Sequence, residues 1–209
     1  MNGREVDDGR ATGGKTGGAT GDDVPTWEDP YLDRVSDRLM HNYDLTRDEV
    51  IDGERFDLYG RMRIESQKHL FHPVLNYANH GSEEHLFARR AGRATARELE
   101  SLVDLGHRLG DEWIEPSEEH FSTDFTFALV VPRIPADVRE FVSGFSDRTL
   151  LKYGYYGHYE INLLVVAPEE EAAVGSRNAD VIRAFRLWRD VPAESPGLFA
   201  RVFRRFGRS

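Results

Sequence analysis

The fold is decided by residues 151–166, Leu151-Lys-Tyr-Gly-Tyr-Tyr-Gly-His-Tyr-Glu-Ile-Asn-Leu-Leu-Val-Val166, in which apolar and polar side chains alternate over the longest run in the chain. Successive side chains of a β-strand point to opposite faces, so this period of two predicts a half-buried strand. Tyr159 and Ile161 would lie on the core face, and His158 and Glu160 on the polar face. The two glycines of the run are positions where the strand can bend or break into a hairpin.

Two other stretches, residues 56–64 and 121–131, alternate in the same way and predict further strands. Capping residues and apolar spacing predict helices in four places: from Asp29-Pro30 for about 13 residues, from Thr95 to Trp113, from Pro135, and over 177–188. These elements predict an α+β domain with a mainly antiparallel sheet of five or six strands and helices packed chiefly on one face.

The composition divides the chain into three parts. Residues 1–25 are rich in Gly, Thr and Asp and predict a disordered acidic leader, because they offer too little apolar surface to offset the entropy of ordering. Residues 26–192 form the expected α+β domain. Residues 193–209 predict a basic amphipathic tail, with four arginines after Gly197, that could dock on the protein itself, a membrane surface or a partner.

The charged residues point to a salt-adapted organism. The net charge is −10, and only three of the 27 basic residues are lysines, Lys15, Lys68 and Lys152. Carboxylates keep their hydration in molar salt, whereas lysine stems expose apolar surface to it. An acidic protein from a GC-rich genome, where lysine codons are scarce, is the alternative explanation.

High salt restricts the kind of ligand that can be bound. The Debye length at molar salt is only about 3 Å, and affinity for nucleic acid falls steeply with salt. Nucleic-acid binding by electrostatics alone is therefore not expected. A ligand has to be held by stacking, by hydrogen bonds in a pocket, or by a metal.

Cysteine and long apolar runs are both missing from the sequence. Disulfides, thiolate chemistry and cysteine-based metal sites are therefore excluded. We expect no transmembrane segment, since the longest apolar run is much shorter than a membrane span, and a cytoplasmic location.

Polar residues of the predicted strands form the first candidate site. If the apolar faces of all the strands look toward one core, the opposite face gathers carboxylates, guanidinium groups, an imidazole and tyrosines. A solvated outer face would explain this mixture equally well. The candidate ligand-binding residues are Asp57, Arg61, Arg63, Asp124, Lys152, Tyr156, His158 and Glu160.

Histidines and acids form two candidate metal sites. His69, His72, His80 and His85 lie close in sequence, although without a recognised ligand spacing, so structural or surface roles are the simpler reading. Asp124 and Glu160 with Lys152 are residue types that a metal-dependent phosphodiesterase uses.

The stretch from Tyr31-Leu-Asp-Arg-Val-Ser-Asp-Arg-Leu39 to Leu187-Trp188, and above all Leu151-Lys-Tyr-Gly-Tyr-Tyr-Gly-His-Tyr-Glu160, resembles a family of uncharacterised haloarchaeal proteins, a domain of unknown function. The resemblance covers about 160 residues and omits both tails. It implies a haloarchaeal source, and it carries no activity and no catalytic residue.

The sequence therefore predicts a non-catalytic binding or interaction protein of a halophilic archaeon, acting through the polar sheet face or the C-terminal basic helix. Its partner would be a protein or a small molecule, no cofactor is expected, and a homo-oligomer is compatible with the sequence. The alternative is a metal-dependent hydrolase or phosphodiesterase that uses the His69–His85 cluster or Asp124 and Glu160.

Overall fold

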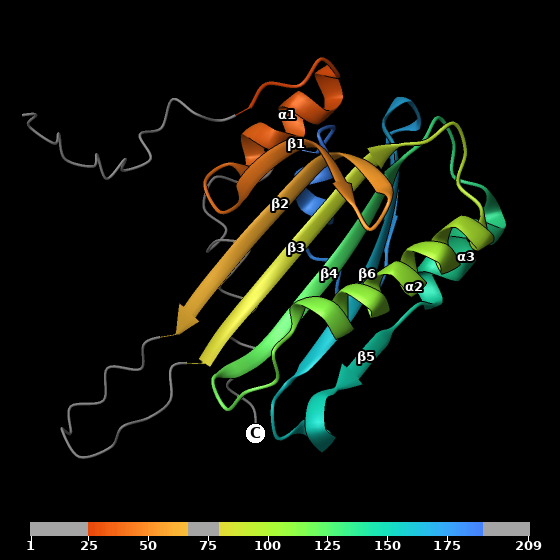
Figure 1. The fold of residues 1–209 in the computed structure, drawn as a ribbon. Coiled ribbons are helices and arrows are strands. Elements are labelled where there is room, and N and C mark those ends of the chain that lie inside the picture. The colour runs from red at the N-terminus through yellow and green to blue at the C-terminus, as the bar shows by residue number, and fades with distance from the viewer. Residues whose placement is uncertain (1–24, 67–79, 190–209) are drawn as a thin grey trace, which may run out of the picture.

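A computed structural model describes residues 25–66 and 80–189. Two 3-10 turns, Leu151–Gly154 and Pro168–Glu170, accompany the helices and strands. The elements follow in the order α1 (Pro30–Leu39), β1 (Asp44–Ile51), β2 (Glu54–Ser66), β3 (His80–Arg90), α2 (Ala96–Trp113), β4 (His120–Val130), α3 (Ala136–Gly144), β5 (Asp147–Leu150), β6 (His158–Ala167), β7 (Ala172–Gly175) and α4 (Ile182–Phe185) (Figure 1).

The seven strands form one mixed sheet in the order β1-β2-β3-β4-β6-β5, with β7 also pairing with β6. β3, β4 and β6 are parallel neighbours at its centre, and the outer pairs are antiparallel. The prediction of a mainly antiparallel sheet of five or six strands is therefore wrong. α2 lies between β3 and β4, and α3 between β4 and β6, and such crossovers return the chain parallel to its previous strand.

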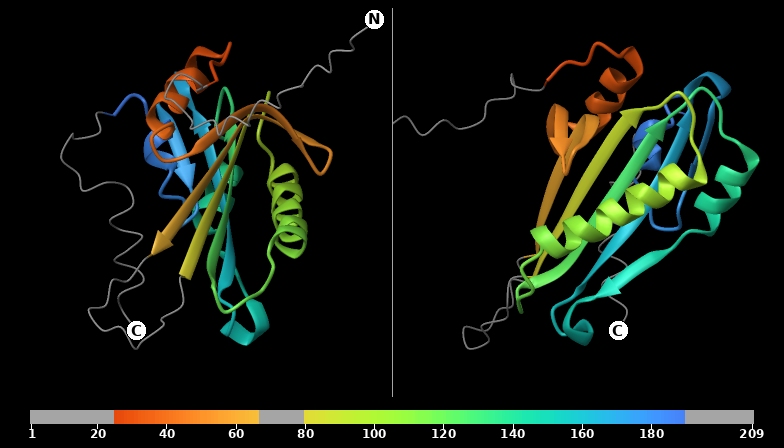
Figure 2. Two further views of the ribbon diagram at one scale, coloured as in Figure 1. Left: turned by 60° about the vertical axis from the view of Figure 1, so that its left-hand side comes forward. Right: turned by 45° about the vertical axis from the view of Figure 1, so that its right-hand side comes forward.

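One face of the sheet, called here the first face, is covered by α2 and α3 (Figures 1 and 2). Phe127, Ile161 and Leu163 are buried there. α2 approaches closely because it carries glycines at the contact: a Cβ added at Gly106 would lie 2.9 Å from the Cδ1 of Ile161. The apolar half of the predicted 151–166 alternation is confirmed from Tyr159 onward.

The opposite face, called here the second face, has its own core beneath α1 and α4. Val35 of α1 and Phe185 of α4 pack there with Leu58, Ala128 and Leu164 of the sheet, all buried. Figure 2 shows α2 on one side of the sheet, with α1 and the blue C-terminal segment on the other. Helices therefore cover both faces rather than chiefly one, as central parallel strands require.

The chain reverses before β6 instead of continuing as one strand. Residues 151–157 form a turn between β5 and β6, in which Lys152 and Tyr153 have positive φ values of 45° and 59°. Tyr153 is 95% exposed, although the alternation assigned it to the core face. Gly157, at φ 77°, is required because a Cβ there would lie 2.1 Å from the carbonyl oxygen of Phe121.

Several other expectations differ from the structure in extent. The helix expected over residues 177–188 is reduced to the four residues of α4. β1, which exposes most of its side chains, was not predicted. The predicted leader 1–25, all but its last residue, and the tail 193–209 lie outside the described residues. No helix in the described ranges is long and apolar enough to cross a membrane.

Candidate functional site

The predicted polar face does not exist as one surface. The apolar stripe of β2, with Leu58 and Met62, looks toward the second face, whereas Ile161 of β6 looks toward the first. Arg61 and Arg63 therefore lie on the opposite side of the sheet from Asp124, His158 and Glu160. The strands were predicted in the right places, but the prediction that their apolar side chains all face the same side of the sheet was wrong.

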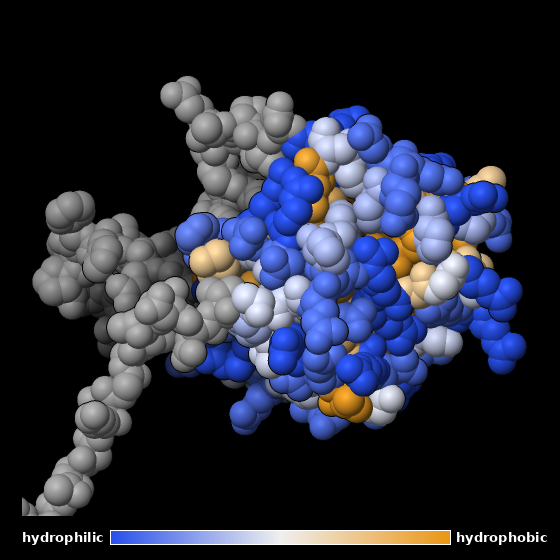
Figure 3. Space-filling view, turned by 90° about the horizontal axis from the view of Figure 1, so that it is seen from above, coloured by the Kyte–Doolittle hydropathy of each residue, from blue (hydrophilic) through white to orange (hydrophobic). Residues whose placement is uncertain are grey.

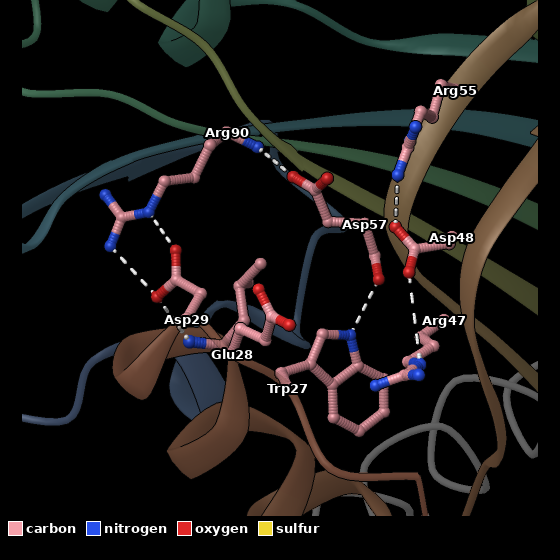
Figure 4. A pocket seen from close by; sticks show the side chains of 9 residues that line it. Trp27, Glu28, Asp29, Arg47, Asp48, Arg55, Asp57 and Arg90 are labelled. Atoms are coloured by element: carbon pink, nitrogen blue, oxygen red, sulfur yellow. Dashed lines mark hydrogen bonds and ion pairs between the residues drawn. The ribbon is translucent and has the colours of Figure 1, made fainter.

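Asp57 lies in a third place, in a pocket of about 470 Å³ where β2 meets the start of α1 (Figure 4). Its carboxylate accepts a hydrogen bond from the backbone N–H of Arg90 at 2.7 Å, and its carbonyl oxygen accepts one from the indole of Trp27 at 2.6 Å. Arg90 in turn pairs with Asp29, the N-cap of α1. Burial raises the pKa of Asp29, but Arg90 and two backbone donors of α1 outweigh it, so the pKa is lowered. These bonds fasten α1 to the sheet.

Lys152 and Tyr156 belong to the turn before β6. The Lys152 side chain is exposed, and in the described part of the chain it pairs with no carboxylate. The carbonyl oxygen of Tyr156 accepts a hydrogen bond from Nδ1 of His120 at 2.8 Å. The structure therefore separates Lys152 from the predicted pair of acids.

Three carboxylates form a row across the centre of the second face. Glu84 of β3 is the register partner of Asp124 of β4, which is in turn the partner of Glu160 of β6. We call these three residues the acid row. Neighbouring strands lie about 4.8 Å apart, and two unit charges at that distance repel by about 3 kcal/mol at an effective dielectric constant of about 20. The sequence predicted the pair of Asp124 and Glu160 on one face, and missed Glu84.

Glu160 lies at the β6 end of the acid row, where Arg148 and Asn178 contact its carboxylate. Glu160 is 5% exposed, and its carboxylate accepts a hydrogen bond from Asn178 at 2.6 Å and forms an ion pair with Arg148 at 3.0 Å. Arg148 also contacts Nε2 of His158 at 2.7 Å. His158 and Glu160 are thus buried and paired, and do not lie on a solvated face.

Glu84, at the other end of the acid row, is held by Tyr43. Burial raises the pKa of Glu84 to about 7, and Asp180 raises it further, although a hydrogen bond from the Tyr43 hydroxyl acts in the opposite direction. Burial and the nearby Glu84 and Asp124 raise the pKa of Tyr43 well above its ordinary value. The Glu84 carboxyl therefore changes its protonation state near neutral pH.

Metal-binding geometry is not found in the described ranges. No group of three or more histidines and acids within residues 25–66 and 80–189 is arranged to hold a metal ion. Of the predicted histidine cluster, only His85 has a described side chain, and it is buried on the first face. His69, His72 and the side chain of His80 lie outside the described residues.

The first face carries a pocket of about 530 Å³ where α2 ends, a volume typical of small-molecule sites. Trp113, the last residue of α2, forms one wall and is 39% exposed. We call this the Trp113 pocket. The residues that line it are Tyr59, Arg61, Glu83, His85, Trp113, Ile114, Glu115, His120 and Thr123.

Two arginines share one carboxylate at the edge of this pocket. The Nε of Arg61 donates to Glu83, and the Nε of Arg63 lies 3.3 Å from the same oxygen. In the described part of the chain, the terminal amino groups of both arginines have no hydrogen-bond partner. Burial raises the pKa of Glu83, but the arginines and His85 outweigh it, so the pKa is lowered.

Tyr59 and His85 form a hydrogen-bonded pair on the floor of the pocket. The Tyr59 hydroxyl lies 2.8 Å from Nδ1 of His85, and the His85 ring lies 5.0 Å from that of Trp113. Burial lowers the pKa of His85 to about 4 against the effect of Glu83, and burial raises the pKa of Tyr59 to about 12. Both side chains are therefore neutral at pH 7.

His120 and Thr123 complete the pocket. With Nδ1 bonded to a backbone carbonyl oxygen, His120 uses Nε2 to contact the Thr123 hydroxyl at 2.9 Å. Sequence reasoning assigned no site role to Trp113, His120 or Thr123. Trp113 ends the apolar stripe of a helix, which is also what a core residue does, so the sequence contained no signal for the pocket.

The comparisons with known proteins give a family without a function. Residues 28–187 match the family described as Domain of unknown function (DUF8052). The chain belongs to this family. The matched region spans α1 to the end of the described domain and leaves out both tails, as the predicted resemblance did. No curated protein and no solved structure matches the chain.

Proposed function

We propose that this DUF8052 protein is a binding protein for a small planar anion, which the Trp113 pocket holds by stacking and hydrogen bonds. The proposal is carried by one observation, a partly exposed Trp113 at a pocket beside two guanidinium groups whose terminal amino groups have no hydrogen-bond partner within residues 25–66 and 80–189. Indole rings stack on flat ligands, and guanidinium groups bind carboxylate or phosphate through bidentate hydrogen bonds.

The floor of the pocket supports the same class of ligand. Tyr59 and His85 are neutral and offer hydrogen bonds without adding charge, and Glu83 is already compensated by Arg61 and Arg63. A negative group would therefore meet the arginines, while an uncharged ring lies against Trp113.

The test compares three ligands of one shape and different charge: 2-naphthoate, 2-naphthamide and 2-naphthamidine. Quenching of tryptophan fluorescence and calorimetry of the full chain should show binding in the order anion, amide, cation. Trp113→Ala should weaken naphthoate binding by about 5-fold or more, since stacking on an aromatic wall contributes on the order of 1 kcal/mol or more. Tyr155→Ala, which removes an 85% exposed ring outside the pocket, is the matched control and should change nothing.

Equal affinity for all three ligands would contradict the role of Arg61 and Arg63. An unchanged affinity in Trp113→Ala would place the ligand elsewhere, and the proposed function would then be wrong.

We further propose that the protein works in the salt-rich cytoplasm of a halophilic archaeon. Support comes from the net charge of −10 and the near absence of lysine. The surface seen in Figure 3 is mainly hydrophilic, with small separate apolar patches. Circular dichroism at about 0.1 M and about 2 M KCl is the test, because self-repulsion should unfold the chain at low ionic strength. A full native signal at the lower concentration would contradict the halophilic origin.

A further inference from the structure

The Trp113 pocket contains two hydroxyl groups, and each of them is bonded to a histidine. The Tyr59 hydroxyl lies 2.8 Å from Nδ1 of His85, and the Thr123 hydroxyl lies 2.9 Å from Nε2 of His120. A hydroxyl group has one proton to donate and two lone pairs that accept. The direction of each hydrogen bond therefore decides what the hydroxyl can offer to a ligand.

The direction of the bond at His120 follows from the other nitrogen of its ring. Nδ1 of His120 lies 2.8 Å from the backbone carbonyl oxygen of Tyr156, and a carbonyl oxygen can only accept. The proton of the neutral ring is therefore on Nδ1, and Nε2 is an acceptor. Because the Thr123 hydroxyl donates its proton to Nε2, its oxygen has only lone pairs to offer to the pocket.

The hydrogen bond at His85 runs in the same direction. Nε2 of this neutral ring lies 3.7 Å from the carboxylate of Glu83, which is paired with Arg61 and Arg63. The negative charge favours the tautomer with its proton on Nε2, and Nδ1 then accepts from the Tyr59 hydroxyl. Tyr59 therefore also presents an acceptor oxygen to the pocket.

We infer that the Trp113 pocket selects a planar heteroaromatic anion that carries ring N–H donors, and that Tyr59 and Thr123 make this selection. The inference rests on the proposed function, in which the anionic group lies against Arg61 and Arg63 and the ring lies against Trp113. Tyr59 and Arg61 both line the pocket and are two residues apart on β2. That separation is about 7 Å along a strand, so a bicyclic ligand can reach both side chains.

Burial makes a mismatch at these two acceptors unfavourable. Thr123 is 3% exposed, and Tyr59 is half-buried. A ligand with an ether oxygen in place of the N–H would bring lone pairs against lone pairs and leave the acceptors unsatisfied. Sites that hydrogen-bond a ligand N–H discriminate strongly against analogues that lack it. Tyr59 and Thr123 are therefore specificity-determining residues of the pocket.

The experiment compares ligands that differ in one ring atom. Indole-5-carboxylate and indole-6-carboxylate are each paired with the benzofuran carboxylate of the same substitution, and 2-naphthoate is the reference for the proposed function. Calorimetry of the full chain is run at pH 8, in a KCl concentration that gives the full native circular-dichroism signal. At least one indole should bind about 10-fold or more tightly than its benzofuran counterpart.

Removing the two acceptors should remove this preference. The double variant Tyr59→Phe/Thr123→Val should bring the ratio of indole to benzofuran affinity to about 1, and the single variants show which oxygen accepts the N–H. The histidine nitrogens cannot replace the hydroxyls, because they lie 2.8 and 2.9 Å behind the hydroxyl oxygens.

The same chemical changes outside the pocket provide matched controls. Tyr155→Phe and Thr46→Val remove hydroxyl groups at exposed positions and should leave the affinity ratio unchanged. Thermal unfolding of each variant separates lost binding from lost folding.

Equal affinities within both indole–benzofuran pairs, or tighter binding of the benzofurans, would overturn the inference, while binding of naphthoate would leave the proposed function standing. An indole preference that survives in the folded double variant would also overturn it, because another group would then accept the N–H. If none of the ligands binds up to about 10 mM, the proposed function is wrong and the inference with it.

Discussion

Glu83 and Glu84 are neighbours in sequence, but their pKa values are shifted in opposite directions. Glu83 points to the first face, where Arg61 and Arg63 hold its pKa below the ordinary value despite its partial burial. Glu84 points to the second face, where burial raises its pKa to about 7 and, among the residues that the structure describes, no arginine pairs with it. The alternation of a strand thus places one carboxylate beside cations and the next in a negative environment.

The two faces also differ in how open they are. The first face ends in the Trp113 pocket, whose tryptophan is 39% exposed. The second face buries His158, Glu160 and Asn162 almost completely. Charge and enclosure are therefore distributed differently across one sheet, and substitutions on the two faces should have different consequences.

The largest effects are expected in the cores themselves, where the two faces should be alike. Ile161→Ala on the first face and Leu164→Ala on the second should each lower the free energy of unfolding by about 2–5 kcal/mol, since both side chains are fully buried. Denaturant unfolding followed by circular dichroism measures both. A cost below about 0.5 kcal/mol for Leu164→Ala would mean that the second face is solvated, as the sequence alone suggested.

The pH dependence of stability should separate the faces. The pKa of Glu84 is raised from 4.5 to about 7 by burial, so its contribution is complete below pH 4.5 and is lost as the pH rises through 7. The pKa of His85 is lowered from 6.5 to about 4 by burial, so its contribution is present above pH 6.5 and is lost as the pH falls through 4. Between pH 4.5 and 6.5 the two slopes oppose each other.

Substituting either residue should leave only the pH dependence of stability that the other one contributes. From pH 4.5 to 6.5, Glu84→Gln should leave a stability that rises with pH, and His85→Gln one that falls, each by about 1–3 kcal/mol. Unfolding free energies measured at several pH values decide the matter. Parallel profiles in the two variants would contradict the assignment of these residues to different environments.

One arginine from each face gives a matched pair with smaller effects. Arg148→Ala removes a partner of the buried Glu160 and should cost about 1–2 kcal/mol after allowance for the half-exposed guanidinium. Arg63→Ala should cost less than about 0.5 kcal/mol, because Arg63 is 65% exposed and Arg61 still pairs with Glu83. Thermal unfolding at fixed salt compares the two variants. Equal losses of stability would contradict the view that the ion pair of Arg148 is more buried than that of Arg63.

The smallest effect is expected in the turn before β6, which belongs to neither face. Tyr153 is 95% exposed, so Tyr153→Asn should change the free energy of unfolding by less than about 0.5 kcal/mol. Asn also tolerates the positive φ at this position. A loss above about 1 kcal/mol in chemical denaturation would show that Tyr153 packs against the body of the protein.

The sequence was most informative where a single element explains its own pattern. Thr95 caps α2 as predicted, with its side chain accepting from the backbone N–H of Glu98. The alternation from Tyr159 through Leu163 placed the first-face residues of β6 correctly. It also put Asp124 and Glu160 on one face, because each strand's polar residues oppose its own apolar ones.

What the sequence by itself determined is the periodicity of each strand and helix, and hence which of a strand's residues share a side. It also determined the acidic, lysine-poor composition and the resemblance to an uncharacterised family. Only the tertiary structure decided how the strands are phased against one another. Both faces of the sheet are buried, so an apolar stripe satisfies itself equally well on either side. Leu58 therefore lies on the second face and Phe125 on the first. Arg61 lines the same pocket as Trp113, and Glu84 is the register partner of Asp124.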